Sequence, residues 1–401
     1  MAEENQVEIR SREGQNDRPG GYRPFDKNKG LFRVSPAFRI CVSELRDFLG
    51  EMKQQLDMEE AKIGQEDPGQ RTLLERKLLQ TAEKIITHYL DRFVPIMNQI
   101  VVRFSPEEHL IHRNFFQQHL HPFLLLSPFV KRAYSKPLGY AGDYEMMDML
   151  YRSHDQGESL FARVINRYCC QVTAARSVVK RVPYMLDRIG RTIDQVSRHK
   201  EAVSFTSIGC GPAMEIQELI QRNPMSDPCR VTLVDTEPEA LHHCHERISR
   251  LKEVTQSRTR VSFLNRSIHQ LILDPDMTDS LGSQDLIYAM GLFDYLPTHI
   301  AKRLLQKLYR LLSDEGELII GNLNASNDAR YFMEYGAEWY VIYRTSQEMM
   351  EMAEGLTSPL HVEVEADAEE AQLYLIVKKW KGLTSPIYRG QEATSHFYGK
   401  N

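Results

Sequence analysis

The sequence of 401 residues lacks the features that mark several classes of protein. Its six cysteines show no Cys-x-x-Cys spacing, so we expect neither a zinc site nor a dense disulfide framework, and we interpret them as reduced thiols. The most apolar short run, residues 123–129, contains Pro128 and is far too short to span a bilayer. The chain starts Met-Ala-Glu-Glu-Asn, without a basic region followed by an apolar one, so no secretory signal is expected. These absences favour a cytoplasmic protein without a transmembrane segment.

A surplus of positive charge is also lacking. The formal net charge is −5, and a protein whose main partner is a nucleic-acid backbone usually carries a basic face. The composition, 42% hydrophobic and 26% charged, is that of ordinary globular proteins. The length suits two domains or one elaborated domain. We therefore expect a small molecule rather than a nucleic acid as the partner, and the sequence leaves the oligomeric state undetermined.

The chain divides into four segments by composition. Residues 1–30 are rich in Gly, Pro, Arg, Asn and Asp and predict a disordered N-terminal segment. Residues 31–198 show apolar residues mainly at intervals of three and four, which predicts a helical domain. Residues 199–380 change to alternating strands and helices, and 381–401 form an irregular tail.

Two helix starts and one long helix are predicted in the first half. Thr72 with Glu75, and Ser105 with Glu108, have the spacing of a capping box, and Pro106 suits the first turn after Ser105. A further helical stretch is expected over 159–189.

Short apolar runs in the second half predict the strands of a sheet. They cover residues 203–208, 230–234, 260–264, 285–290 and 317–322. Helical stretches lie between them, and this alternation predicts parallel strand–helix–strand units in a doubly wound α/β fold. Two final runs, 361–365 and 372–377, are separated by a short acidic link and predict an antiparallel terminal hairpin.

The turn after the first of these strands is rich in glycine. It reads Gly209-Cys210-Gly211-Pro212-Ala213, and glycine lets a backbone pass close to a ligand while the next helix offers free N–H groups. A glycine pair is also common in plain tight turns. Here it follows a strand, opens a helix that carries Glu215, and lacks the third glycine of the dinucleotide fingerprint. We interpret it as a cofactor-binding turn.

Polar residues follow the next two strands. Asp235 ends the second strand, where a carboxylate can accept both hydroxyls of a ribose, although it can also cap the helix that begins at Glu237-Pro238. Ser267 follows the third strand, where an adenine edge would lie. The fourth strand runs to Met290 at the carboxyl edge of the sheet, which is the ligand edge of open α/β folds.

This pattern resembles the class I S-adenosylmethionine-dependent methyltransferases over residues 200–380, the terminal hairpin included. The resemblance implies a Rossmann-like fold and S-adenosylmethionine as cofactor, with Gly209 and Gly211 cradling it and its ribose on Asp235. Glu215, Ser267 and Met290 complete the expected cofactor side. No metal is expected.

A second motif lies before the sheet. The run Lys136 to Met147, together with Gly291 to Pro297 and Phe332 to Tyr335, resembles the bacterial extracellular-factor 3-hydroxypalmitate methyl ester synthases over residues 121–378. The resemblance implies a helical domain that forms a lid over the cofactor, and methyl transfer to a fatty-acyl carboxylate in bacterial small-molecule biosynthesis.

Carried over to this chain, the motif implies roles for three residues. Tyr140 and Tyr144 would pack against the positively charged sulfur, since a cation favours an aromatic face. Asp143 would bind the amino group of the cofactor.

The acceptor side is expected from Tyr288, Glu334, Tyr343 and Arg344, which lie near the ends of the fourth and fifth strands. Arg344 could bind a substrate carboxylate with two N–H groups. An amine or hydroxyl acceptor would need a base, for which Glu334, Asp294 and Tyr288 are candidates. Surface packing of a helix is the alternative for this segment.

Two functions besides methyl transfer stay open. One is an enzyme that cyclises S-adenosylmethionine or transfers its aminocarboxypropyl arm. The other is a non-catalytic regulator that binds the cofactor. The groups around the sulfonium, and the room left for an acceptor, would separate these alternatives.

Overall fold

The computed structural model describes residues 33–152, 154–222, 229–273, 281–357 and 359–379. Seven helices come first along the described chain. Their bounds are α1 Pro36–Ile63, α2 Pro68–Val101, α3 Pro106–Leu124, α4 Pro128–Ser135, α5 Tyr144–Tyr151, α6 Leu160–Cys169 and α7 Thr173–Val196. The expected segments 1–30 and 381–401 lie outside the described residues. Where the chain is described, no helix is long and apolar enough to cross a membrane.

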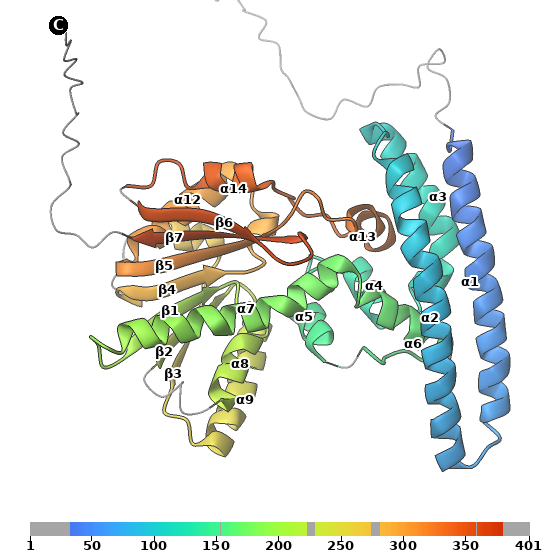
Figure 1. The fold of residues 1–401 in the computed structure, drawn as a ribbon, viewed down its shortest axis with the longest axis horizontal. Helices are drawn as coiled ribbons and strands as arrows, with labels where there is room; N and C mark the ends of the chain where they lie inside the picture. Colours follow the sequence, from blue (N-terminus) through green and yellow to red (C-terminus); the bar gives the residue numbers. More distant parts are fainter. Residues whose placement is uncertain (1–32, 153, 223–228, 274–280, 358, 380–401) are drawn as a thin grey trace, which may run out of the picture.

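The long helices α1, α2 and α3 lie side by side at one end of the molecule (Figure 1). The capping box at Ser105 is confirmed, because its side chain accepts from the Glu108 N–H and Glu108 binds back to the Ser105 N–H. The predicted helix start at Thr72 is wrong. The helix already begins at Pro68, and the Thr72 hydroxyl donates to the carbonyl of that residue from inside the helix.

The expected helix over 159–189 is two helices. The chain turns between Cys169 and Thr173, so α6 packs on α2 while α7 packs on the sheet. The turn lets the apolar faces of the two helices be buried against different neighbours.

The second half is a seven-stranded sheet with the order β3-β2-β1-β4-β5-β7-β6. Its strands are β1 Val203–Ile208, β2 Cys229–Asp235, β3 Arg260–Asn265, β4 Gln284–Ala289, β5 Leu312–Leu323, β6 Pro359–Ala366 and β7 Gln372–Lys379. Strands β1 to β5 are parallel, and the hairpin β6–β7 joins β5 antiparallel through β7. The predicted doubly wound fold with a terminal hairpin is confirmed.

Helices cover both faces of the sheet, as Figure 1 shows. Helix α7 packs on one face with α8 Met214–Gln221 and α9 Pro238–Thr255. The other face is covered by α10 Ile268–Leu273, α12 Thr298–Arg310 and α14 Ser346–Met352. Helix α13 Arg330–Ala337 leaves the sheet after β5 and packs against α3 and α4. The helical half and the sheet therefore meet around the carboxyl ends of β1, β4 and β5.

Candidate functional site

The glycine turn after β1 has the backbone that its sequence predicts. Gly209 and Gly211 have φ of +64° and +52°, in the region that favours glycine. Ala213 also takes a left-handed conformation, at φ 48°. A Cβ on Gly211 would meet no atom within 4 Å, because this glycine faces open space.

That open space belongs to a cavity of about 340 Å³, which we call the central cavity. Its walls come from the loop before α5, from α5 and α7, from the glycine turn, and from the ends of β2, β4 and β5. The residues that line it include Tyr140, Gly142, Tyr144, Val178, Arg181, Gly209, Gly211, Glu215, Asp235, Tyr288, Met290, Gly291, Asp294, Tyr295, Leu323 and Trp339. The structure thus brings seven of the nine expected cofactor residues, from both halves of the chain, to one cavity; the two that do not line it are Asp143 and Ser267.

Asp235 connects the second strand to the glycine turn. Its Oδ2 accepts from the Gly211 N–H at 2.9 Å, and its Oδ1 accepts from the Glu237 N–H at 3.0 Å. Burial raises the pKa of Asp235, and these N–H groups oppose the shift. Each carboxylate oxygen has a second lone pair, so the side chain can still accept a ribose hydroxyl. The helix cap expected as the alternative is not seen, because the N-cap residue of α9 is Glu237 and no side chain caps this helix. The bond from the Glu237 N–H closes the turn before the helix, and the ribose contact stays a prediction.

The loop before α5 closes over the cavity next to aromatic residues. Tyr140 and Tyr144 line the cavity, and the ring of Tyr140 contacts that of Tyr295 edge-on. The Tyr295 hydroxyl accepts from Trp339 Nε1 at 3.0 Å. A Cβ on Gly142 would lie only 2.4 Å from this hydroxyl, so a glycine is needed for the loop to approach so closely.

Asp143 does not have its expected role. Its side chain is 0% exposed and binds the guanidinium of Arg132, with both Nε–oxygen distances at 3.0 Å. It also caps α5 by accepting from the Met146 N–H. Asp143 is absent from the cavity lining, so it shapes the loop instead of binding a cofactor amino group.

Glu215 and Tyr288 form a polar pair in the central cavity. The Tyr288 hydroxyl donates to Glu215 Oε1 at 2.9 Å. Enclosure by the protein raises the pKa of Glu215 to about 6, and the Tyr288 hydrogen bond opposes this shift. Burial raises the pKa of Tyr288 as well, so this hydroxyl stays protonated near neutral pH and acts as a donor.

The two remaining cofactor candidates lie in different places. Met290 lines the central cavity at the end of β4. Ser267 does not line this cavity. Its hydroxyl accepts a hydrogen bond from the Gln270 N–H at the start of α10. Ser267 therefore acts as a helix cap in this structure.

Arg344 is also placed differently from the expectation. It is 2% exposed, and its guanidinium donates to the carbonyl oxygens of Phe293 and Leu296 and to Oδ1 of Asn322. It is not among the cavity-lining residues. These N–H groups are used within the protein, so the expected carboxylate clamp at Arg344 is corrected to a structural role.

Glu334 and Tyr343 lie together outside the central cavity. Glu334 binds Arg330 at 2.9 Å, and the Arg330 guanidinium lies 4.9 Å from the ring centre of Tyr343. Neither residue lines the cavity. Of the four residues expected on the acceptor side, only Tyr288 faces it.

Arg181 and Asp294 are polar residues of the central cavity. The sequence pattern indicates Asp294 only as a candidate base and does not point directly to Arg181. A signal existed for Arg181, since Val178, Val182 and Met185 surround it at helical spacing and place it on an apolar face. Tyr295 and Trp339 were likewise missed as cavity walls.

These features fit S-adenosylmethionine. The open side of Gly211 leaves room for a ligand against the turn, Asp235 offers acceptor positions, and Tyr140 and Tyr144 offer aromatic faces for a cation. All six cysteines are buried and none forms a disulfide bond in the described part of the chain, and Cys244 donates to the carbonyl oxygen of Gly211 at the same turn.

Comparisons with known proteins point the same way. Residues 207–318 match the family described as a methyltransferase domain. No curated protein matches the chain at a significant level.

Several solved structures are similar in fold. An N-methyltransferase, NodS from Bradyrhizobium japonicum with S-adenosylhomocysteine, is 14% identical over 59% of this chain and 97% of its own, with a TM-score of 0.36. Magnesium protoporphyrin IX methyltransferase from Synechocystis is 11% identical over 62% of this chain and 98% of its own, with a TM-score of 0.40. The methyltransferase domain at 207–318, the strand order and the fit of the cavity identify the protein as an S-adenosylmethionine-dependent transferase with S-adenosylmethionine as its cofactor.

Proposed function

We propose that the protein transfers the methyl group of S-adenosylmethionine to a small molecule with an apolar body and a carboxylate head, such as a fatty acid. The observation that carries this proposal is a second cavity beside the central one. It measures about 50 Å³, is lined by apolar side chains, and shares Val178, Leu323 and Trp339 with the central cavity. We call it the apolar cavity.

The apolar cavity lies where the helical half meets the segment after β5. Its walls include Leu124, Phe129, Ala175, Phe332 and Met333. Burial of apolar surface favours binding of a hydrocarbon group there, while a polar acceptor body would lose its hydrogen bonds with water. The volume suits a short apolar group, since one water needs about 10–15 Å³ on this scale. A long acyl chain would require side chains of α4 or α13 to move.

In this proposal the residues of the central cavity hold the cofactor. Asp235 accepts the ribose hydroxyls, the glycine turn lies along the amino-acid arm, and Tyr140 and Tyr144 face the sulfonium. The cofactor supplies a methyl group already activated by a positively charged sulfur. The protein therefore contributes mainly by aligning the acceptor and excluding water. A carboxylate acceptor needs no base.

The helical half takes part in the site in this proposal. We propose that residues 31–198 form a lid domain over the cofactor-binding domain 199–380. Tyr140, Tyr144 and Arg181 support this division, because they line the central cavity from the helical side.

The proposal is tested by product analysis. Purified protein is incubated with methyl-labelled S-adenosylmethionine and carboxylic acids of increasing chain length. We expect a labelled methyl ester and an equal amount of S-adenosylhomocysteine. Ala175→Leu, which fills part of the apolar cavity, should lower turnover of long acids more than of short ones while S-adenosylhomocysteine binding is kept. Absence of any methylated product across the panel would contradict the proposal.

One observation favours a second candidate. The central cavity, at about 340 Å³, lies near the lower end of the range for ligand sites, roughly 300–1,000 Å³. A cavity that encloses the cofactor and little else suits a reaction within the cofactor itself, such as cyclisation. Formation of methylthioadenosine without an acceptor in the same assay would favour this candidate.

A further inference from the structure

A buried arginine lies in the wall of the central cavity. Arg181 is on α7, is 7% exposed, and belongs to the cavity lining. Among the described lining residues, the cationic side chains are Arg181 and Arg266. Arg266 follows β3 at the other end of the site, where its Nη1 donates to the neighbouring carbonyl of Asn265. Arg181 is therefore the cation of the deep part of the cavity.

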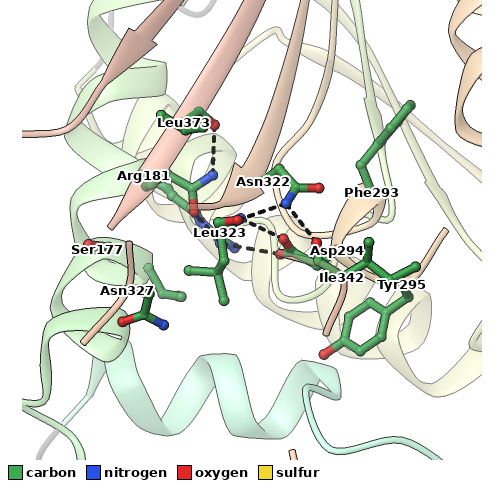
Figure 2. Close-up of polar contacts among 12 residues, drawn as sticks. Ser177, Arg181, Phe293, Asp294, Tyr295, Asn322, Leu323, Asn327, Ile342 and Leu373 are labelled. Carbon is green, nitrogen blue, oxygen red and sulfur yellow. Dashed lines mark hydrogen bonds and ion pairs between the residues drawn. The ribbon is translucent and has the colours of Figure 1, made fainter. Parts of the chain in front are cut away.

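The positive charge of Arg181 is only partly compensated. Its Nε and Nη2 donate to Oε1 of Gln372, a neutral group. The nearest carboxylate oxygen is Oδ2 of Asp294, 3.6 Å from Nη2, which is beyond a normal hydrogen bond. Figure 2 shows Arg181 and Asp294 turned toward one another, with Leu323 beside them.

Asp294 is itself engaged elsewhere. Its Oδ1 accepts from the Leu323 N–H at 2.6 Å, which holds the carboxylate against the end of β5. Burial raises the pKa of Asp294 to about 6, and Arg181 opposes this shift. The pair is therefore looser than a two-point arginine–carboxylate contact.

A second arginine on the same helix provides the contrast. Arg188 is similarly buried, at 8% exposed, but its Nη2 forms an ion pair with Glu317 Oε1 at 2.8 Å and its Nε donates a hydrogen bond to the same oxygen at 3.0 Å. Arg188 does not line the central cavity. Its charge is thus satisfied within the protein, whereas that of Arg181 faces the cavity.

The end of β4 is shaped to let Arg181 reach the cavity. A Cβ on Gly291 would lie 3.0 Å from Nη1 of Arg181, closer than nine in ten such contacts in proteins, so the arginine would have to shift. Gly291 also lines the cavity. Because Gly291 has no side chain, Nη1 of Arg181 can lie against the backbone at the end of β4, where both residues line the cavity.

We propose that Arg181, held by Gln372 and Asp294, is the carboxylate-binding residue of the central cavity. A guanidinium offers N–H groups in a planar fork that matches a carboxylate, and burial strengthens the attraction. Two sources of carboxylate are compatible with its position. One is the amino-acid arm of the cofactor. The other is the head of the acceptor, because Val178 lies one helical turn away and lines both cavities. The acceptor source rests on the proposed function.

Calorimetry on the full chain tests this proposal with two pairs of ligands. The first pair is S-adenosylhomocysteine and its decarboxylated analogue. The second is octanoate and octanol, each added in the presence of S-adenosylhomocysteine. Arg181→Lys keeps the charge but loses the planar fork, and Arg188→Lys is the matched control on the same helix.

We expect Arg181→Lys to bind one carboxylate ligand at least tenfold more weakly, with its uncharged partner unaffected. Loss for S-adenosylhomocysteine assigns the carboxylate to the cofactor, and loss for octanoate alone assigns it to the acceptor. If octanoate does not bind the wild-type protein, the cofactor pair alone decides.

Wild-type affinity of Arg181→Lys and of Arg181→Met for both carboxylates would overturn the proposal. An equal loss for the charged and uncharged partners would overturn it too, because the effect would then be structural. If Arg181→Met does not fold, the lysine variant decides. These readouts use binding, so a failure to detect methyl transfer would count against the proposed function and leave this test intact.

Discussion

The hydroxyl of Tyr288 lies 2.9 Å from Oε1 of Glu215, and the two residues join the fourth strand to the helix that follows the glycine turn. Both line the central cavity. A carboxylate at this position can accept from a ligand ammonium group, and Tyr288 keeps it oriented.

This relationship predicts a pH-dependent affinity for the cofactor product. The pKa of Glu215 is raised to about 6, so the group is protonated below this pH and ionised above it. If the ionised form binds an ammonium, the affinity for S-adenosylhomocysteine should rise between about pH 5 and 7. Asp294 titrates in the same range, so Glu215→Gln is the necessary comparison. A variant that keeps both the affinity and its pH dependence would exclude Glu215 as the cause.

The same shift predicts an effect on stability. The pKa of this glutamate is about 4.5 in the unfolded chain, its ordinary value, and about 6 in the folded chain, so folding takes up protons between these pH values. The free energy of unfolding should therefore decrease as the pH rises from about 4.5 to 6. Chemical denaturation of the wild type and of Glu215→Gln over this range measures it, and an equal decrease in both proteins would contradict the assignment.

Asp235→Ala is expected to weaken binding of S-adenosylhomocysteine at least tenfold, about 1.4 kcal/mol. The variant loses the carboxylate that holds the Gly211 N–H and that we propose for the ribose. Calorimetry measures the loss, and thermal unfolding checks that the variant is folded. Unchanged affinity in a folded variant would remove Asp235 from the site.

Gly211→Ala is expected to weaken binding of S-adenosylhomocysteine by more than the loss of folding stability in the same variant can explain. The residue has φ +52° and faces open space in the cavity, so a methyl group costs about 1–2 kcal/mol of backbone strain and also occupies ligand volume. Gly282→Ala is the matched control, since Gly282 has φ +65°, also faces open space, and does not line the central cavity. If the two variants bind S-adenosylhomocysteine with equal affinity, the prediction that a ligand lies against Gly211 is wrong.

Arg344→Lys is expected to lower the stability by about 1–3 kcal/mol, because buried carbonyl oxygens lose their donors. Affinity for S-adenosylhomocysteine should stay close to that of the wild type. Denaturant unfolding measures the change. An unaltered unfolding midpoint, with weaker binding of a carboxylate ligand, would restore Arg344 as a site residue.

The sequence by itself determined the sheet, the glycine turn and its partner Asp235. Strand–helix alternation is a local pattern, and parallel strands bring their carboxyl ends to one edge, so Gly209, Gly211 and Asp235 had to meet. The loop at Tyr140 and Tyr144 came from a family resemblance, and its contact with the cavity is seen in the structure.

Only the tertiary structure decided which long side chains face the cavity. Arg344 and Arg181 look equally able to bind a carboxylate in the sequence. Arg344 donates its N–H groups to the carbonyl oxygens of Phe293 and Leu296. Arg181 is oriented by its hydrogen bond to Gln372, 191 residues away. The direction of a flexible charged side chain depends on partners that are distant along the chain, and no local pattern encodes them.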